Sequence, residues 1–178
     1  MKTLSFKKLH DFCESEEFKI LNEKSLCILD IDGIFFEGLT DPHFWFSNIK
    51  KEYLEELEKI EKTKSNIWIF TDRNLFGFWG PYKKQLLDVL SENGRINVRK
   101  FKGSKEFLDK AKELDKALII NAKKPGEESQ KVLIKGLENF EEVFYFASQD
   151  IPFKYDDKTL VEKLKCDKIH LYFIDIRK

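Results

Sequence analysis

The sequence is poor in the residues that interrupt or cross-link a fold. Its 178 residues include only 8 glycines and 4 prolines, and they contain no repeat, linker or low-complexity tract. The three cysteines, Cys13, Cys27 and Cys166, form no C-x-x-C pair, so we expect reduced thiols. No apolar stretch reaches 18 residues, and the first ten residues lack the apolar segment of a signal peptide. These absences predict a cytoplasmic protein without a membrane partner.

Net charge is absent as well. Basic and acidic residues number 32 each, so no overall field attracts nucleic acid or an anionic membrane, and nucleic acid is a disfavoured partner. What the chain does have is apolar material: 42% of its residues are hydrophobic and 17 are phenylalanine. This amount suits one domain spanning residues 1–178 with a sizeable core. The oligomeric state does not follow from the sequence.

One short stretch, S-L-C-I-L-D-I-D-G from Ser25 to Gly33, organises the rest of the chain. Its uninterrupted apolar run predicts a parallel strand that is buried on both faces. Asp30 and Asp32 follow at i and i+2, so their side chains should point to the same side. Two carboxylates this close favour a divalent cation between them, most simply Mg²⁺. Gly33 allows a sharp turn directly after the second acid.

Along the whole chain, predicted strands alternate with predicted helices. We expect strands at 26–31, 67–70, 96–101, 117–120, 143–147 and 169–175. We expect helices at 3–20, 44–62, 81–93, 104–114, 127–139 and 158–165, the first of them within an N-terminal segment (1–24) that packs on the sheet. This alternation predicts an α/β fold: a three-layer, doubly wound, Rossmann-like sheet that is mostly parallel.

Polar residues follow several of these strands, at the edge where an open α/β sheet places its active site. In chain order they are Asp30 with Asp32, Thr71-Asp72-Arg73, Lys123-Lys124 and Ser148-Gln149-Asp150. Such a set suits phosphoryl transfer. One carboxylate attacks phosphorus and a second moves the leaving group's proton. Mg²⁺ neutralises the phosphate oxygens, while a lysine and a hydroxyl hold the transferring group.

Together these residues resemble the motifs of the haloacid dehalogenase-like (HAD) superfamily. The family's first motif, a hydrophobic strand followed by D-x-D-G, is matched by Cys27 to Gly33. The second, a Thr or Ser after a strand, is matched by Thr71, and the third, a lysine, by Lys124 in K-K-P-G. The fourth, an acidic cluster after a further strand, falls on Ser148 to Asp150. The resemblance spans roughly residues 25–175.

The resemblance implies a role for each matched residue. Asp30 would be the nucleophile that forms an aspartyl-phosphate, and Asp32 would be the general acid and base. The ligands of Mg²⁺ would be Asp30, Asp32 and Asp150. The remaining matches would contact the phosphate or the substrate: Thr71, Lys124, Gly33, Asp72 and Arg73. A Mg²⁺-dependent phosphatase acting on a phosphomonoester is therefore the expected function.

Two features leave alternatives open. The family's fourth motif normally presents two acids, whereas residues 147–150 offer only Asp150. The alternative function is a catalytically inactive HAD-fold module that binds but hydrolyses nothing. The phosphate-contacting lysine can be Lys123, Lys124 or Lys131. Phosphate transfer to an acceptor other than water would use the same residues, so the sequence does not separate it from hydrolysis.

The segments that could form a cap over this site are short. Between Asp32 and Thr71 lie 38 residues, enough for a flap at 33–45 and one crossover helix, and the 52 residues between Thr71 and Lys124 are used by predicted core elements. The absence of a large cap predicts an open site that takes a phosphorylated small molecule or macromolecule. The leading helix, D-I-D-G, Trp45-Phe46 and T-x-R at Thr71 also loosely resemble an uncharacterised acid-phosphatase-like HAD group of intracellular bacteria.

Overall fold

The structure is a computed structural model of the 178-residue chain. It describes residues 1–31, 33–35, 49–71, 85, 88–89, 96–99, 117–121, 137–148, 157–163 and 169–176. Of residues 70–71, 96–99, 117–121, 157, 160 and 163 it describes the backbone alone.

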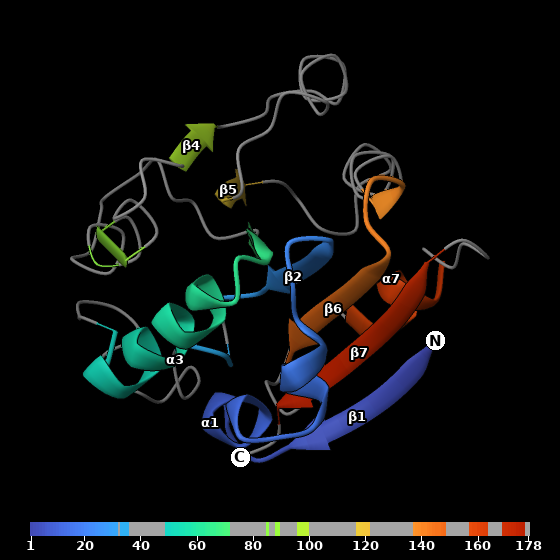
Figure 1. Cartoon of the computed structure of the whole chain (residues 1–178), viewed down its shortest axis with the longest axis horizontal. Helices are drawn as coiled ribbons and strands as arrows, with labels where there is room; N and C mark the ends of the chain where they lie inside the picture. The colour runs from blue at the N-terminus through green and yellow to red at the C-terminus, as the bar shows by residue number, and fades with distance from the viewer. Residues whose placement is uncertain are drawn as a thin grey trace.

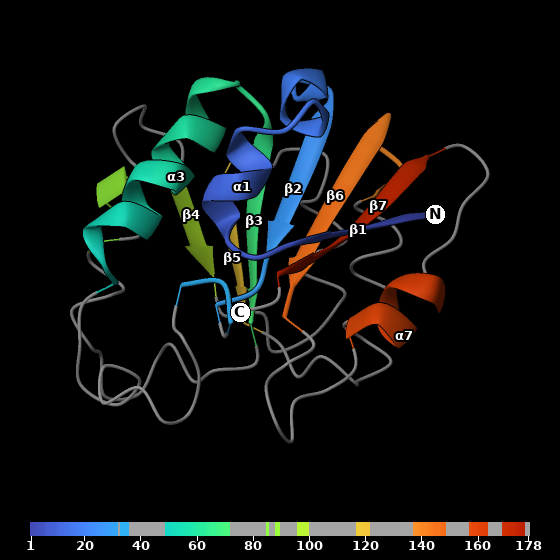
Figure 2. The same cartoon turned by 90° about the horizontal axis from the view of Figure 1, so that it is seen from below.

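A seven-stranded sheet forms the centre of the molecule, and every strand pairing in it is parallel (Figures 1 and 2). The strands are β1 (Lys2–Phe6), β2 (Ser25–Leu29), β3 (Asn66–Thr71), β4 (Ile96–Arg99), β5 (Ala117–Asn121), β6 (Glu142–Ala147) and β7 (His170–Ile176). They lie side by side in the order β1-β7-β6-β2-β3-β5-β4. All six strands that the sequence predicts are present, and the fold is a parallel α/β fold.

The strand order places a topological switch point beside β2. From β2 the chain proceeds to β3, β4 and β5 on one side, and it then returns to β6 on the other side. The pairing of β2 with β6 runs from Ser25 opposite Glu142 to Leu29 opposite Phe146. In open α/β sheets, ligands bind outside the carboxyl ends of the strands at such a reversal. The carboxyl ends of β2 and β6 are therefore the first place to look for a site.

Helices cover both faces of the sheet. Cys27 and Leu29 of β2 belong to a core cluster with residues of α1 (Leu9–Cys13) and α3 (Lys51–Lys62), which lie next to each other on one face (Figures 1 and 2). Leu26 and Ile28 alternate to the other face, where α7 (Asp157–Lys163) lies. Because both faces are covered, all five residues of β2 are buried, as its apolar run predicts.

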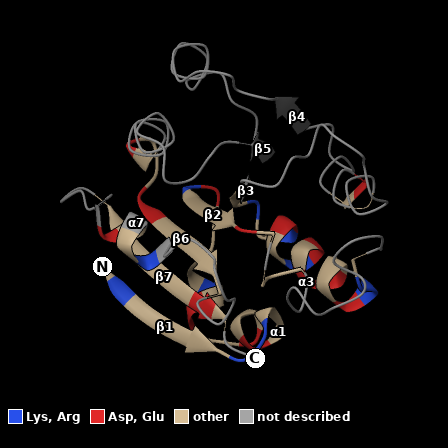
Figure 3. Ribbon diagram, turned by 180° about the vertical axis from the view of Figure 1, so that it is seen from behind, with Lys and Arg blue, Asp and Glu red and all other residues tan. Residues whose placement is uncertain are grey.

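α3 is an amphipathic helix. Tyr53, Leu57 and Ile60 lie at spacings of four and three and are buried against the sheet, while most other positions of the helix are Lys or Glu (Figure 3). The helix was expected over 44–62, but Lys50 is its N-cap, so Ile49 and Lys50 precede it. The helix therefore begins later than the apolar spacing indicates, because the buried Ile49 continues that spacing before the helix starts.

The N-terminal segment corrects a second prediction. A single helix was expected over 3–20, but the segment begins with strand β1, continues through α1, and ends in a 3₁₀-helix at Glu17–Ile20. Leu4 and Phe6 lie at i and i+2 and are both packed against the core, which is the period of a strand. β1 forms because the open side of β7 accepts it, a long-range pairing that local periodicity does not reveal.

The other predicted helices are described in part. α7 confirms the helix expected over 158–165 within two residues at each end. Gln85, Asp88 and Val89 are helical, as the helix expected over 81–93 requires, and the helix expected over 127–139 has Leu137 in it and a turn at 138–139. The helix expected over 104–114 lies outside the described residues. Within the described part of the chain, no helix is long and apolar enough to cross a membrane.

Candidate functional site

Asp30 lies at the carboxyl end of β2, beside the switch point. Its amide donates to the carbonyl of Phe146 over 3.2 Å, so pairing with β6 extends one residue beyond the strand. Its side chain is only 1% exposed. The Oδ1 atom accepts a hydrogen bond of 2.7 Å from the amide of Ile31, which fixes the orientation of the carboxylate. An acid buried this deeply depends on its hydrogen bonds and other partners to offset the hydration that its carboxylate loses.

A tight turn follows Asp30 and is closed by glycine. Gly33 adopts a φ of 82°, in the left-handed region that a Cβ atom disfavours. The amide of Phe35 then donates to the carbonyl of Ile31 over 3.0 Å, and the side chains of Ile34 and Phe35 enter the core. The turn therefore anchors the chain on both sides of position 32. The prediction that Gly33 permits a sharp turn is confirmed.

The structure places Thr71 at the same edge of the sheet. β3 pairs with β2, with Ile69 opposite Leu29, and Thr71 is the last residue of β3. Its backbone therefore lies one strand away from the Asp30 turn. The remaining predicted site residues, including both alternative lysines, lie outside the described residues: Asp32, Asp72, Arg73, Lys123, Lys124, Lys131 and Asp150.

Two further polar residues lie at this edge, and the sequence argument assigned a role to neither of them in particular. Ser148, directly after β6, is 2% exposed, and Asp175, near the end of β7, is 1% exposed. Asp175 pairs in register with Ala147, whose strand neighbours β2. The sequence signal that could have found Asp175 is the one that located Asp30: an acid at the carboxyl end of a predicted strand. It was missed because apolar residues surround it on both sides.

The donors at this edge suit a hard divalent cation. Mg²⁺ prefers oxygen ligands, commonly one or two carboxylates together with water and substrate phosphate. The described residues supply carboxylate oxygens from Asp30 and, one strand beyond β6, from Asp175. Among the described residues no three His, Cys, Asp or Glu side chains gather into a complete metal centre.

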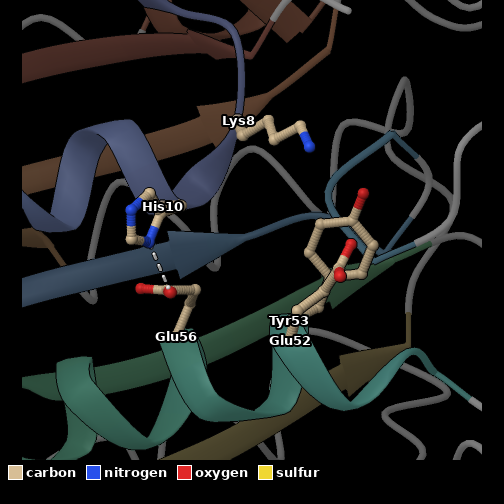
Figure 4. A pocket seen from close by; sticks show the side chains of 5 residues that line it. All are labelled: Lys8, His10, Glu52, Tyr53 and Glu56. Carbon is tan, nitrogen blue, oxygen red and sulfur yellow. Dashed lines mark hydrogen bonds and ion pairs between the residues drawn. The ribbon is translucent and has the colours of Figure 1, made fainter.

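A separate hollow of about 160 Å³ opens between α1 and α3 (Figure 4). It is lined by Lys8, His10, Glu52, Tyr53 and Glu56. Nδ1 of His10 donates to Oε1 of Glu56 over 2.8 Å, and Nζ of Lys59 lies 3.2 Å from Oε2 of Glu56. The carboxylate of Glu56 is thus already balanced by two basic groups. These contacts join the two helices, and the hollow is a feature of their packing.

Burial alone would raise the pKa of Glu56, but it is outweighed by the hydrogen bonds from His10, Cys13 and Lys59, which hold the pKa below its ordinary value. Glu56 is therefore ionised at neutral pH. The nearby Cys13 shows the opposite effect: burial, and then Glu56 itself, raise the pKa of its thiol. A thiol in this state is a poor nucleophile.

No model of a protein family matches the chain, and no curated protein or solved structure is detectably similar to it.

Proposed function

We propose that the chain is a Mg²⁺-dependent phosphatase of the HAD type, in which Asp30 is the nucleophile. The observation that carries the proposal is the position of Asp30: a 1% exposed carboxylate at the carboxyl end of the central strand, beside the topological switch point. Catalytic groups of open α/β sheets gather at this place. The D-x-D-G sequence around Asp30 and the strand-end position of Thr71 agree with the same reading.

In this mechanism the carboxylate of Asp30 attacks phosphorus in line with the leaving oxygen, forming an aspartyl-phosphate. The hydrogen bond from the amide of Ile31 to Oδ1 holds the carboxylate in one orientation, which lowers the entropic cost of attack. Asp32 protonates the leaving group and then activates the water that hydrolyses the intermediate. When bound, Mg²⁺ neutralises the phosphate oxygens and reduces their repulsion of the attacking carboxylate.

Among the remaining assignments, that of Thr71 is supported by its place at the end of β3. Thr71 ends the strand next to β2, so a phosphate bound at Asp30 lies within the reach of that edge. Lys124 and Asp150 complete the set as phosphate contact and metal ligand. The short spacings between the motifs leave no room for a large cap, which favours an open site for a phosphorylated small molecule or macromolecule.

The experiment compares release of product from an aryl phosphate by the wild type, Asp30→Asn and the control Asp11→Asn, each with and without Mg²⁺. Asp11 is an exposed residue of α1 whose Oδ2 accepts from the amide of Lys8, a bond that asparagine can keep. We expect activity that requires Mg²⁺, is abolished in Asp30→Asn, and is retained in Asp11→Asn. Full activity of a folded Asp30→Asn variant would refute the mechanism.

A silent wild type is interpreted by its thermal stability. A competent site binds Mg²⁺ only in the folded state, so the ion raises the melting temperature of the protein. Mg²⁺ stabilisation without turnover of a panel of phosphomonoesters would favour the inactive binding module, for which the single acid of the fourth motif is the supporting feature. The absence of both turnover and stabilisation would contradict the phosphatase and its metal site together.

A further inference from the structure

The side chain of Gln85 pairs with the main chain of Ile49 through two hydrogen bonds. The amide of Ile49 donates to Oε1 of Gln85 over 2.7 Å, and Nε2 of Gln85 donates to the carbonyl of Ile49 over 3.2 Å. Ile49 is 2% exposed and precedes Lys50, the N-cap of α3. Buried main-chain groups need such partners. The side-chain amide of Gln85 therefore acts on Ile49 as a neighbouring strand would, although the two residues are 36 positions apart.

Ile49 lies toward the same edge of the sheet as Asp30. α3 ends at Lys62 and β3 begins at Asn66, so the helix runs antiparallel to the strands, with its first turn toward their carboxyl ends (Figure 2). The 12 residues of the helix span about 18 Å, close to the length of the six residues of β3, about 20 Å. The start of α3 therefore stands near the height at which β2 and β3 end.

One apolar cluster joins the start of α3 to the turn that follows β2. Ile49 belongs to the same buried cluster as Ile34 and Phe35 of that turn. Val89 packs against this cluster and lies one helical turn after Gln85, on the same side of its helix. The helical segment that contains Gln85 and Val89 thus contacts the cluster with an apolar side chain and holds its border with a polar one.

We propose that Gln85 is a positioning residue of this edge: its amide holds the start of α3 against the segment that follows β3, and through Ile49 it keeps the turn after Asp30 in one conformation. This pairing, the Gln85 clamp, ties together the two segments that leave β2 and β3. Its effect on catalysis rests on the proposed function, in which the carboxylate of Asp30 must be held for in-line attack. Its effect on packing does not depend on any reaction.

Amide hydrogen exchange, followed by NMR, tests the effect on packing. It compares the wild type with Gln85→Met, a variant that keeps a side chain of similar length and loses both hydrogen bonds. The amide of Ile49 should exchange about tenfold faster and that of Phe35 at least about threefold faster. The amide of Ile28, in the middle of β2, reports any loss of global stability. If the amides of Ile49 and Phe35 change by no more than that of Ile28, the proposal is overturned.

Asn66 provides a matched control at the opposite edge of the sheet. It is partly buried, as Gln85 is, and its Nδ2 atom donates to the carbonyls of Glu23 and Ser25 over 3.0 and 3.3 Å. Asn66→Leu removes these two bonds with a side chain of similar size. It should leave the exchange of the amides at the carboxyl edge within the change seen at Ile28. An equal effect of the two substitutions at Phe35 would show a general loss of stability and overturn the clamp.

A measurement on the wild type decides the matter if Gln85→Met does not fold. Low concentrations of urea speed exchange through each local opening by a factor that grows with the surface exposed in that opening. We expect the amides of Ile49 and Phe35 to respond to urea alike, because they open as one unit below global unfolding. If Phe35 follows the urea dependence of Ile28 while Ile49 shows a weaker one, the two open separately and the proposal is overturned.

Kinetics connect the clamp to catalysis. With an aryl phosphate and Mg²⁺, Gln85→Met should lower kcat about tenfold and leave KM within about threefold, because a small displacement of the nucleophile affects attack more than binding. An unchanged kcat in a variant whose Phe35 amide exchanges faster overturns the role in catalysis. If the exchange results hold and the wild type shows neither turnover nor stabilisation by Mg²⁺, the clamp stands and the proposed function is contradicted. If the wild type is active and the exchange results fail, only the clamp is overturned.

Discussion

The imidazole of His10 and the carboxylate of Glu56 join α1 to α3 through a hydrogen bond of 2.8 Å between Nδ1 and Oε1. Glu56 is 8% exposed in its side chain and His10 is 55% exposed, so the bond lies at the boundary between the core and solvent. Lys59, one turn further along α3, also contacts the Glu56 carboxylate. The stability of this junction depends on pH, because the buried carboxylate of Glu56 must be ionised to hold its two basic partners, His10 and Lys59.

Replacing Glu56 by glutamine should destabilise the protein by about 1–2 kcal/mol at neutral pH, because charged hydrogen bonds to partly exposed partners are lost. The pKa of Glu56 is lowered in the folded protein, so its contribution is present above the pKa of the unfolded state and is lost as the pH falls through the folded pKa. The difference in unfolding free energy between wild type and Glu56→Gln should therefore shrink as the pH is lowered through the acidic range in which glutamate titrates. Urea denaturation at several pH values measures it.

The exposed residue Glu55 provides the control for this prediction. It pairs with Lys51 on the solvent side of the same helix, and both side chains are more than half exposed. Glu55→Gln should change stability by less than about 0.5 kcal/mol. An equal effect of the two substitutions would show that the junction with α1 contributes nothing.

Phe12 should be one of the most sensitive positions in the N-terminal segment. It is fully buried, and its ring contacts those of Phe6, Phe18, Phe144 and Phe146, the last at a centroid distance of 4.8 Å. Phe12→Ala should cost about 3–5 kcal/mol, because it leaves a cavity beneath α1. The matched change at the partly buried Phe18 should cost less than half as much. Denaturant unfolding of the two variants tests whether α1 belongs to the core of the domain.

Two positions with left-handed backbone should respond in opposite directions. Lys64, just after the C-terminus of α3, has a φ of 63°. Gly33 has a φ of 82°, and glycine is already the residue that this region favours. Lys64→Gly should stabilise the protein by about 0.5–1 kcal/mol, and Gly33→Ala should destabilise it by about 1 kcal/mol or more. Thermal unfolding checks both variants. Destabilisation by Lys64→Gly would contradict the end of α3 at its C-cap Thr63.

Two thiols should be inert in the native protein. Cys13 is 6% exposed and Cys27 is fully buried, and burial is the main cause that raises the pKa of both thiols. In a Cys166→Ser variant, an aromatic disulfide reagent at mildly alkaline pH should label neither cysteine until denaturant is added, and should then label both. Rapid labelling of the folded variant would show that the junction of α1 with β2 opens readily.

Local sequence was sufficient to predict much of this fold. The apolar run before Asp30 is short, ends in an acid and is followed by a glycine, and each of these features acts through neighbouring residues. The same reasoning located β3 and β6. This reasoning failed at β1. The apolar residues of β1 run on into those of α1, and the two sets together resemble one amphipathic helix.

The site was predictable only in part for a related reason. Asp30 and the turn at Gly33 could be located because their structure follows from adjacent residues. The bond between His10 and Glu56 joins positions 46 residues apart, and nothing near either residue indicates the other. Asp175 was missed because apolar residues flank it in the sequence, and only the pairing of β7 with β6 places it near Asp30.

The sequence by itself therefore determined that a buried strand ends in an acid and turns at a glycine, since burial pattern and backbone preference are local properties. Only the tertiary structure decided which strands lie beside that acid. The order β7-β6-β2-β3 arises from packing between distant segments, and it places the switch point at Asp30 and brings the second buried acid, Asp175, near it. Neighbours across a parallel sheet are joined by long crossovers, so their register is set by the whole core and not by any short stretch of chain.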